Sequence, residues 1–222
     1  TNRILTSVLT RQRLKMLLKY GIAYVIQPDQ VGSRIEKHIM RYPQLFATLA
    51  IEDKLKKGVK KGIIWHTQGS GKTALAFYNV FYLRDHYQKQ NIIAKFYFIV
   101  DRLDLATQAK NEFEGRGLKV EGVSSKEDFI NNIKNAGATA SAAGQQTITV
   151  VNIQKFSDES IASVADYNLN VQRIYFLDEV HRSYHPYGSF HYKLKASDRN
   201  AVLIGLTGTP LISGDYTSRE VF

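Results

Sequence analysis

The sequence predicts an α/β domain built on a doubly wound, mostly parallel sheet. Short apolar runs recur along the chain, segments with helical character separate them, and polar motifs directly follow several of them. Strands that alternate with helices favour parallel pairing, and continuous apolar runs are typical of strands buried on both faces. With 222 residues, the chain is long enough for one large α/β domain or two small ones. The runs expected to form strands are Ile63–Trp65, Lys95–Val100, Lys119–Val123, Thr147–Val151, Arg173–Leu177 and Ala201–Leu206.

The N-terminal part, residues 1–32, is expected to be a helical linker or packing segment that follows an upstream domain. Apolar residues in Ile4–Tyr24 recur at helical spacing. After a turn that contains proline and glycine, Ser33 is expected to cap a second helix, with Glu36 completing a capping box. The main domain is then expected over residues 33–222.

Further helices are expected between the strands. The tetrapeptide Arg41–Gln44 is interpreted as an interruption, after which a helix covers Leu45–Leu55. Another is expected over Asp101–Glu114, and a third over Ser125–Asn135 with the serine as its cap. The stretch Ala136–Gln146 is small, polar and without periodicity, so we expect a mobile loop there.

Composition narrows the class of protein. A hydrophobic content of 44% with 23% charged residues is ordinary for a globular domain. The chain has no cysteine, which excludes a disulfide framework and cysteine-ligated zinc. No apolar run approaches the roughly 20 residues that span a bilayer, and no signal-peptide pattern is present. We therefore expect no membrane association, and a cytoplasmic location.

The charge of the chain points towards a polyanionic partner. Its formal net charge is +10, as is common in proteins that bind nucleic acid. A lysine cluster precedes the strand at Ile63–Trp65. We interpret it as a solvated helix end, with DNA contact as the alternative. The cluster consists of Lys54, Lys56, Lys57, Lys60 and Lys61.

The segment GIIWHTQGSGKTALAF, Gly62–Phe77, carries the main motif. An apolar strand leads into a glycine-bearing turn and then into a helix, an arrangement in which backbone N–H groups cradle phosphates. Gly69 and Gly71 permit the tight bend. Lys72 would reach the β- and γ-phosphates, and the Thr73 hydroxyl would ligate Mg²⁺. The alternative, a chance glycine turn before a core helix, is disfavoured by the strand–turn–helix context.

A second motif, Asp178-Glu179-Val180-His181, follows an apolar strand directly. A carboxylate at a strand tip beside a phosphate-binding loop is placed to hold Mg²⁺ through its waters, which suits Asp178. Glu179 can polarise the attacking water as a general base. The alternative is a surface turn. His181 and His185 are four residues apart, but no glutamate lies between them as in zinc proteases, so zinc is not expected.

Together with the turn Thr207-Gly208-Thr209-Pro210, these motifs resemble a known family. HTQGSGKT, DEVH and TGTP, in this order, resemble the first motor lobe of superfamily 2 helicases and translocases. Further runs narrow the resemblance to the motor (restriction) subunit of type I restriction endonucleases, over roughly Arg41–Ile212. These runs are GIIWHTQGSGKT with Trp65 and His66, FIVDRLDLATQ at Phe98–Gln108, ITVVNIQKF at Ile148–Phe156, and DEVHRS ending at Ser183.

For the nucleotide site, the resemblance implies a RecA-like P-loop NTPase lobe that binds ATP and Mg²⁺. His66 departs from the generic P-loop but is expected in this family. An arginine-tyrosine-x-glutamine element falls at Arg41–Gln44, with Pro43 as a departure, and Gln44 is similar to a glutamine that reads the adenine edge. The implied catalytic residues are Lys72, Asp178, Glu179 and His181. The implied nucleotide-binding residues are Gln44, Gln68, Gly69, Ser70, Gly71, Lys72 and Thr73, with Thr73 and Asp178 serving the metal.

For DNA, the resemblance implies that two segments hold a strand by its phosphates. The first contributes Arg102 and Gln108, and the second contributes Gln154 and Lys155. Asn152 stands where the family usually has threonine, which weakens a hydroxyl–phosphate contact there. The residues implied to couple nucleotide state to DNA grip are His181, Thr207 and Thr209.

The resemblance also implies partners, namely double-stranded DNA and the methyltransferase and specificity subunits of a restriction-modification complex. A second lobe with an arginine finger, and a nuclease cluster, are expected outside these 222 residues. Two alternatives stay open: another superfamily 2 helicase acting on DNA or RNA, and a scaffold that binds ATP or DNA without catalysis.

Overall fold

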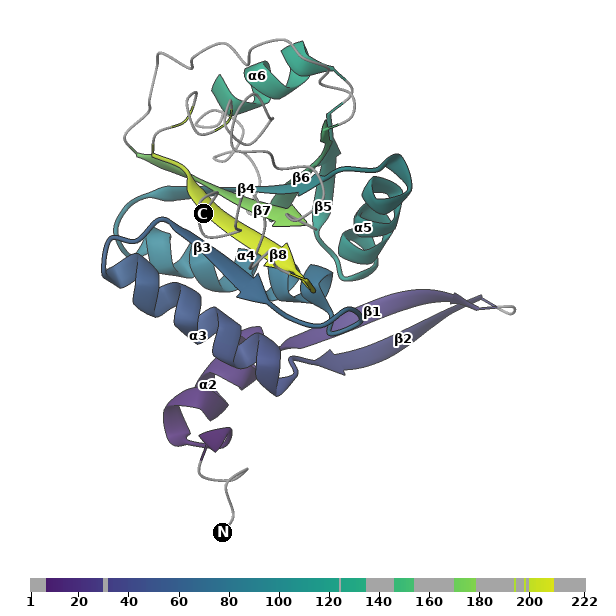
Figure 1. The fold of residues 1–222 in the computed structure, drawn as a ribbon. Coiled ribbons are helices and arrows are strands. Elements are labelled where there is room, and N and C mark those ends of the chain that lie inside the picture. Colours follow the sequence, from purple (N-terminus) through teal and green to yellow (C-terminus); the bar gives the residue numbers. More distant parts are fainter. Residues whose placement is uncertain are drawn as a thin grey trace.

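A computed structural model shows a six-stranded sheet in which every pairing is parallel, in the order β3-β8-β7-β4-β6-β5 (Figure 1). The structure describes residues 7–29, 32–123, 125–134, 146–153, 170–178, 194, 198 and 200–209. The parallel sheet, with helices between its strands, confirms the predicted α/β class. The strands are β3 (Lys61–Trp65), β4 (Ile93–Val100), β5 (Lys119–Gly122), β6 (Thr147–Asn152), β7 (Val171–Asp178) and β8 (Val202–Thr207).

Helices cover both faces of the sheet, as a doubly wound fold requires (Figure 1). On one face, apolar residues of the strands pack in a single core cluster with residues of three helices, and Met16 of the N-terminal segment joins the same cluster. On the other face, Phe129 and Ile133 of α6 (Lys126–Lys134) pack against Tyr97 and Tyr175. The helices of the first face are α3 (Tyr42–Lys56), α4 (Lys72–Gln88) and α5 (Leu103–Gly115).

The central strands β4 and β7 are buried along almost their whole length, because their apolar runs face a core on each side. Phe98 and Phe176 face the α4 side, and the Tyr97 and Tyr175 rings stack at 4.6 Å on the α6 side. Each fully buried aromatic side chain stabilises the fold by about 1.5–3 kcal/mol. The sheet is thus a rigid platform for whatever follows its strand ends.

The N-terminal region differs from the expectation. A helix is present, α2 (Arg11–Tyr20), but it ends before Ile22, where the strand β1 (Ile22–Asp29) begins. The predicted capping box at Ser33 and Glu36 is wrong, because both residues lie in β2 (Gly32–Ile39). β1 and β2 pair antiparallel as a hairpin that projects from the body of the molecule (Figure 1).

The hairpin rests on the domain through one face only. Ala23 and Val25 are buried, and Val25 and Ile26 approach Gly115 at the end of α5. On the other face, Tyr24, Ile26, Ile35 and Ile39 are each more than half exposed. Packing of β1 against α5 thus favours a strand at Ile22–Tyr24, where the sequence predicted the end of a helix.

Other predicted elements agree with the structure. Ser125 caps α6, since its Oγ accepts a hydrogen bond from the Asp128 N–H at 3.1 Å. The helix expected over Leu45–Leu55 is α3, which begins three residues earlier at Tyr42. The predicted interruption at Arg41–Gln44 is wrong, because Arg41 is the N-cap of α3 and the next three residues form its first turn. The predicted loop Ala136–Gln146 lies outside the described residues except for Gln146. Among the described residues, no helix is both long and apolar enough to cross a membrane.

Candidate active site

The carboxyl ends of three neighbouring strands bring the sequence motifs to one edge of the sheet. β3 ends at Trp65, β8 at Thr207 and β7 at Asp178. Trp65 and Thr207 are register partners, and Asp178 is the register partner of Leu206. Ligands of parallel α/β sheets bind at this edge, so the register alone places the three motifs side by side.

The P-loop connects β3 to α4. Gly69 and Gly71 adopt φ values of 76° and 81°, in the left-handed region that favours glycine. α4 begins at Lys72, and the first backbone N–H groups of a helix have no partner within it, so they are available to a phosphate. Gln68, Ser70 and Thr73 lie in the same loop and helix start, as predicted from the sequence. Their roles in binding stay predictions.

The turn after β8 packs directly against the P-loop. The His66 N–H donates to the Thr207 carbonyl at 3.0 Å, which extends the strand pairing into the loop. A methyl group built on Gly208 would lie 3.3 Å from the backbone nitrogen of Gln68 and 3.8 Å from the Lys72 Nζ. The Lys72 ammonium therefore points towards this turn. Within the turn, the Thr209 N–H donates to the Thr207 Oγ1 at 3.2 Å.

Gln44 lies beneath the P-loop and is only 3% exposed. Its Nε2 donates to the Gly71 carbonyl at 2.9 Å, and its Oε1 accepts from the Arg41 N–H at 2.9 Å. The same side chain thus caps α3 and holds the P-loop backbone. Recognition of adenine by Gln44 stays a prediction.

Two polar side chains that sequence reasoning missed continue this contact into the core. The Thr48 Oγ1 donates to the Gln44 carbonyl at 2.9 Å, and the Asn79 Nδ2 lies 3.0 Å from the Thr48 Oγ1. Thr48 and Asn79 are both fully buried. They join α3 to α4, so the position of Gln44 is tied to the helix that follows the P-loop. Gln44 and Thr48 are four residues apart, which places them on the same face of a helix, and this spacing is the signal in the sequence that could have linked them.

The charge of the His66 imidazole in the P-loop depends mainly on its partial burial. Desolvation, and then the positive charge of Lys72, lower the pKa of His66. The imidazole is therefore neutral at pH 7.

The second motif is described only in part. Asp178 is half-buried at the end of β7. Glu179 and His181 lie outside the described residues, so their predicted catalytic and coupling roles are not tested. No group of three His, Asp or Glu side chains that could hold a metal ion occurs in the described part of the chain. The oxygen donors of Thr73 and Asp178 are the type that Mg²⁺ prefers.

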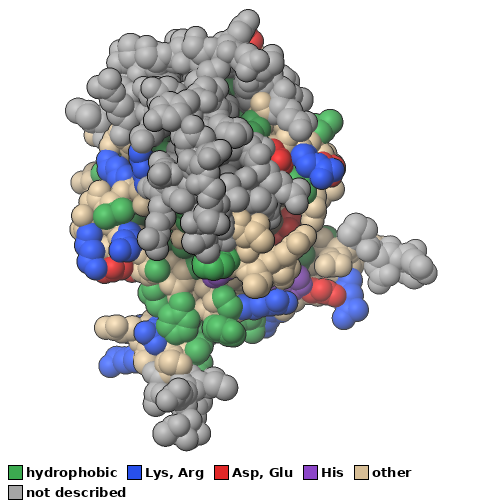
Figure 2. Space-filling view, viewed as in Figure 1, with side chains coloured by type: hydrophobic (Ala, Val, Ile, Leu, Met, Phe, Trp, Pro, Cys, Tyr) green, Lys and Arg blue, Asp and Glu red, His purple; other side chains and the backbone are tan. Residues whose placement is uncertain are grey.

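Of the residues expected to contact DNA, Arg102 and Gln108 are described. Arg102 follows β4 as the N-cap of α5, is half exposed, and forms an ion pair with Asp104 at 3.2 Å. Gln108 is exposed on α5. Gln154 and Lys155 lie outside the described residues. On the face shown in Figure 2, the visible Lys and Arg side chains lie at several separate places, not in a single patch.

The lysine cluster before β3 behaves as a helix end. Lys56 pairs with Glu52 at 2.8 Å, and Lys57 pairs with Asp53 at 2.7 Å, each one helical turn back. Lys60 donates to the side chain of Asn200. These local partners favour the solvated helix end over a DNA contact for this cluster.

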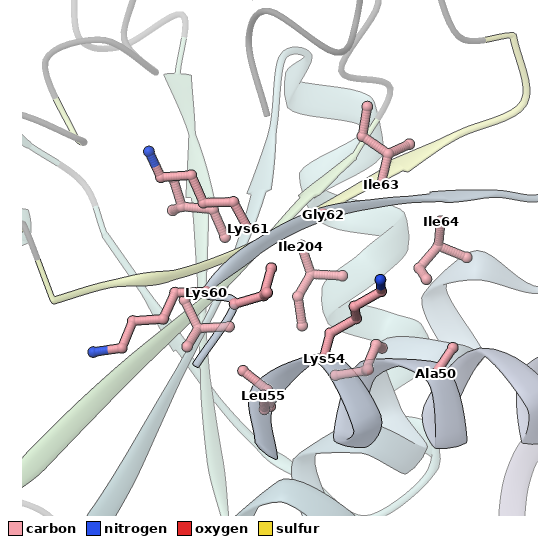
Figure 3. A pocket seen from close by; sticks show the side chains of 13 residues that line it. Ala50, Lys54, Leu55, Lys60, Lys61, Gly62, Ile63, Ile64 and Ile204 are labelled. Atoms are coloured by element: carbon pink, nitrogen blue, oxygen red, sulfur yellow. The ribbon is translucent and has the colours of Figure 1, made fainter. Parts of the chain in front are cut away.

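A pocket of about 320 Å³ lies elsewhere, between α3 and the first residues of β3 and β8 (Figure 3). Leu55, Ile64 and Ile204 contribute apolar surface to the pocket, and Lys54 of α3 also lines it. The pocket does not include the P-loop residues. It is therefore distinct from the candidate nucleotide site.

The fold and the arrangement of motifs define a helicase-like P-loop ATPase lobe, and sequence comparison agrees. Residues 43–222 match the model of the SWI2/SNF2 ATPase family, to which the chain therefore belongs. The curated relatives are endonuclease subunits of type I restriction enzymes, which confirms the resemblance seen in the sequence.

Two relatives illustrate the similarity. The type I restriction enzyme SsaAORF53P endonuclease subunit of Staphylococcus saprophyticus is 30% identical over 175 residues, which is 77% of this chain. The putative type I restriction enzyme MjaVIIP endonuclease subunit of Methanocaldococcus jannaschii is 34% identical over 132 residues, or 57% of this chain. The matches span only 17% and 12% of those relatives.

A solved structure supports the fold. The ATP-dependent Type ISP restriction-modification enzyme LlaBIII bound to DNA superposes with a TM-score of 0.54 at 15% identity. The match covers 86% of this chain and 14% of that chain. At this identity the likeness concerns the fold alone.

A pair of glycine substitutions tests the contact between Gln44 and the P-loop. Gly69→Ala adds a Cβ in open space, so it should cost about 1–2 kcal/mol through its positive φ alone. At Gly71 the new Cβ would lie 2.6 Å from the Gln44 Nε2. Gly71→Ala should therefore cost a further 0.5–1.5 kcal/mol or so, the net contribution of the lost hydrogen bond. Urea unfolding of both variants measures this, and equal losses would contradict the role of Gln44.

Proposed function

We propose that this chain is the ATP-binding motor lobe of the DNA-translocating subunit of a type I restriction-modification enzyme. ATP hydrolysis on the lobe drives movement along double-stranded DNA before cleavage. The observation that carries the proposal is the convergence of the P-loop, the Asp178 strand end and the Thr207–Thr209 turn at one edge of the sheet. The relatives named as restriction endonuclease subunits support the choice of system.

The residues divide the chemistry between them. Lys72 and the N–H groups at the start of α4 hold the β- and γ-phosphates. Thr73 and, through water, Asp178 hold Mg²⁺, which when bound neutralises charge that develops on the transferred phosphoryl group. Glu179 directly follows Asp178 in the sequence and accepts the proton of the attacking water. Thr207, Thr209 and His181 transmit the nucleotide state to the DNA-binding residues.

DNA contacts involve phosphates and not bases. Arg102 follows the carboxyl end of β4 and forms an ion pair with Asp104, and both side chains of this pair are more than half exposed. Such a pair contributes little to stability, so Arg102 can exchange Asp104 for a phosphate at low cost. Gln108, Gln154 and Lys155 complete the proposed contact. The proposed partners are the methyltransferase and specificity subunits, and the proposed location is the cytoplasm.

Nucleotide binding is tested by removing the P-loop cation. Lys72→Ala should weaken Mg–ATP binding about ten- to a hundredfold, because a charge-assisted hydrogen bond contributes about 1.5–3 kcal/mol. Isothermal calorimetry measures the affinity. The control is Lys89→Ala, which removes an exposed lysine at the far end of the same helix and should leave the affinity unchanged. Unchanged affinity in the Lys72 variant would refute the assignment.

Hydrolysis is tested at the proposed general base. Glu179→Gln keeps the size of the side chain but removes its basicity, so ATP should still bind while phosphate release falls to background. A steady-state phosphate-release assay measures this under conditions in which the wild-type protein hydrolyses ATP. Stimulation of the wild-type rate by RNA but not by duplex DNA would indicate another helicase. Full activity of the variant would assign the base elsewhere.

The DNA contacts are tested by salt dependence. Arg102→Ala and Lys155→Ala should each reduce the slope of log affinity against log salt concentration by about one unit. The reduction should be the same on unrelated duplexes, because phosphate contacts carry no base information. Fluorescence anisotropy with two duplex sequences measures both slopes, with Lys89→Ala as the control. A loss confined to one sequence would show that these residues read bases.

A further inference from the structure

Trp65 is the single tryptophan of the chain, and it ends the strand that leads into the P-loop. Its side chain is 61% exposed, so burial does little to hold it in place. The indole N–H donates to the carbonyl oxygen of Gly208 at 3.1 Å. This bond joins the two motif-bearing segments through a side chain, beside the backbone bond from His66 to Thr207.

Gly208 is held from two sides. Its carbonyl accepts the indole N–H, while its Cα faces the Gln68 nitrogen and the Lys72 ammonium, as the position of a built methyl group shows. Those two groups belong to the loop that would receive the phosphates. A phosphate drawn to them therefore comes close to the Gly208 backbone.

This arrangement gives a direct route from the phosphate site to the turn. The Cα of Gly208 is bonded directly to its carbonyl carbon, so a displacement at the Cα moves the carbonyl oxygen that accepts the indole N–H. The indole bond either follows this movement or breaks. Thr207 and Thr209, which flank Gly208, move with it, since the Thr209 N–H is bonded to the Thr207 Oγ1.

We propose that Trp65 is a positioning residue that ties the Thr207–Thr209 turn to the P-loop through the Gly208 carbonyl, so that phosphate in the loop changes the position of the turn. The inference deepens the proposed function and rests on it. No catalytic contact is assigned to the indole. It acts through the backbone of Gly208.

The emission of the single tryptophan tests the route, because indole fluorescence responds to its hydrogen bonding and surroundings. The chain is titrated with three probes, each with Mg²⁺: a non-hydrolysable ATP analogue, inorganic tripolyphosphate and adenosine. The analogue and tripolyphosphate should change the emission, each saturating at the concentration at which calorimetry shows binding. Adenosine should have no effect, which separates the phosphate route from contact between the base and the indole.

A matched pair of variants tests the consequence for turnover. Trp65→Phe keeps an aromatic ring and removes the donor, so turnover should fall about two- to tenfold, the effect of one net hydrogen bond. Its ATP affinity should change less than about twofold, because the P-loop ligands remain. The control is Tyr24→Phe on the hairpin, a residue 60% exposed that also loses its one polar side-chain group. It should change neither quantity.

The outcomes separate the two proposals. Binding of the analogue without a change of emission would overturn the role of Trp65, as would unchanged turnover in Trp65→Phe or equal losses of affinity and turnover. If calorimetry shows no binding of the analogue to the wild-type chain, the proposed function fails and this inference falls with it.

Discussion

The pairing of β3 with β8 is the constraint on which the site depends. The two strands lie far apart in the sequence, yet their register sets Trp65 beside Thr207 and so sets the P-loop against the turn. β7 follows as the next strand and places Asp178 one step further along the same edge. A slip of one residue would turn every side chain of a strand to the other face of the sheet. β8 is buried along its whole length, and Ile64 of β3 packs against the core, so a slip of either strand would disrupt this packing. The core therefore helps to fix the geometry of the site.

Much of this platform could be predicted from the sequence, for a physical reason. Runs such as Lys95–Val100 and Arg173–Leu177 are apolar on both faces, and only a strand buried on both sides accommodates that pattern over so short a length. The hairpin could not be predicted in the same way. β1 is apolar at consecutive positions, and Ile35 and Ile39 in β2 are four residues apart, a spacing shared by one face of a helix and one face of a strand.

The candidate site was predicted where the chemistry is local and missed where it is not. The glycines and Lys72 of the P-loop lie in one short segment, so both the turn and the start of α4 can be predicted from the local sequence pattern. The bonds from Gln44 to Gly71 and from Asn79 to Thr48 arise only when α3 packs on α4. No spacing within a single helix specifies which buried polar groups will meet across such an interface, although most buried polar groups do form hydrogen bonds.

The exposed face of the hairpin has a consequence for the behaviour of the protein in solution. Tyr24, Ile26, Ile35 and Ile39 form a small apolar surface on a chain of net charge +10. Repulsion between copies reaches about 10 Å at 0.1 M salt but only about 3 Å at 1 M, whereas salt does not weaken the attraction between apolar faces. Concentrated salt, which strips nucleic acid from a basic protein, thus also removes the barrier that keeps two such hairpins apart. Purity and monodispersity therefore place opposite demands on the ionic strength of the buffer.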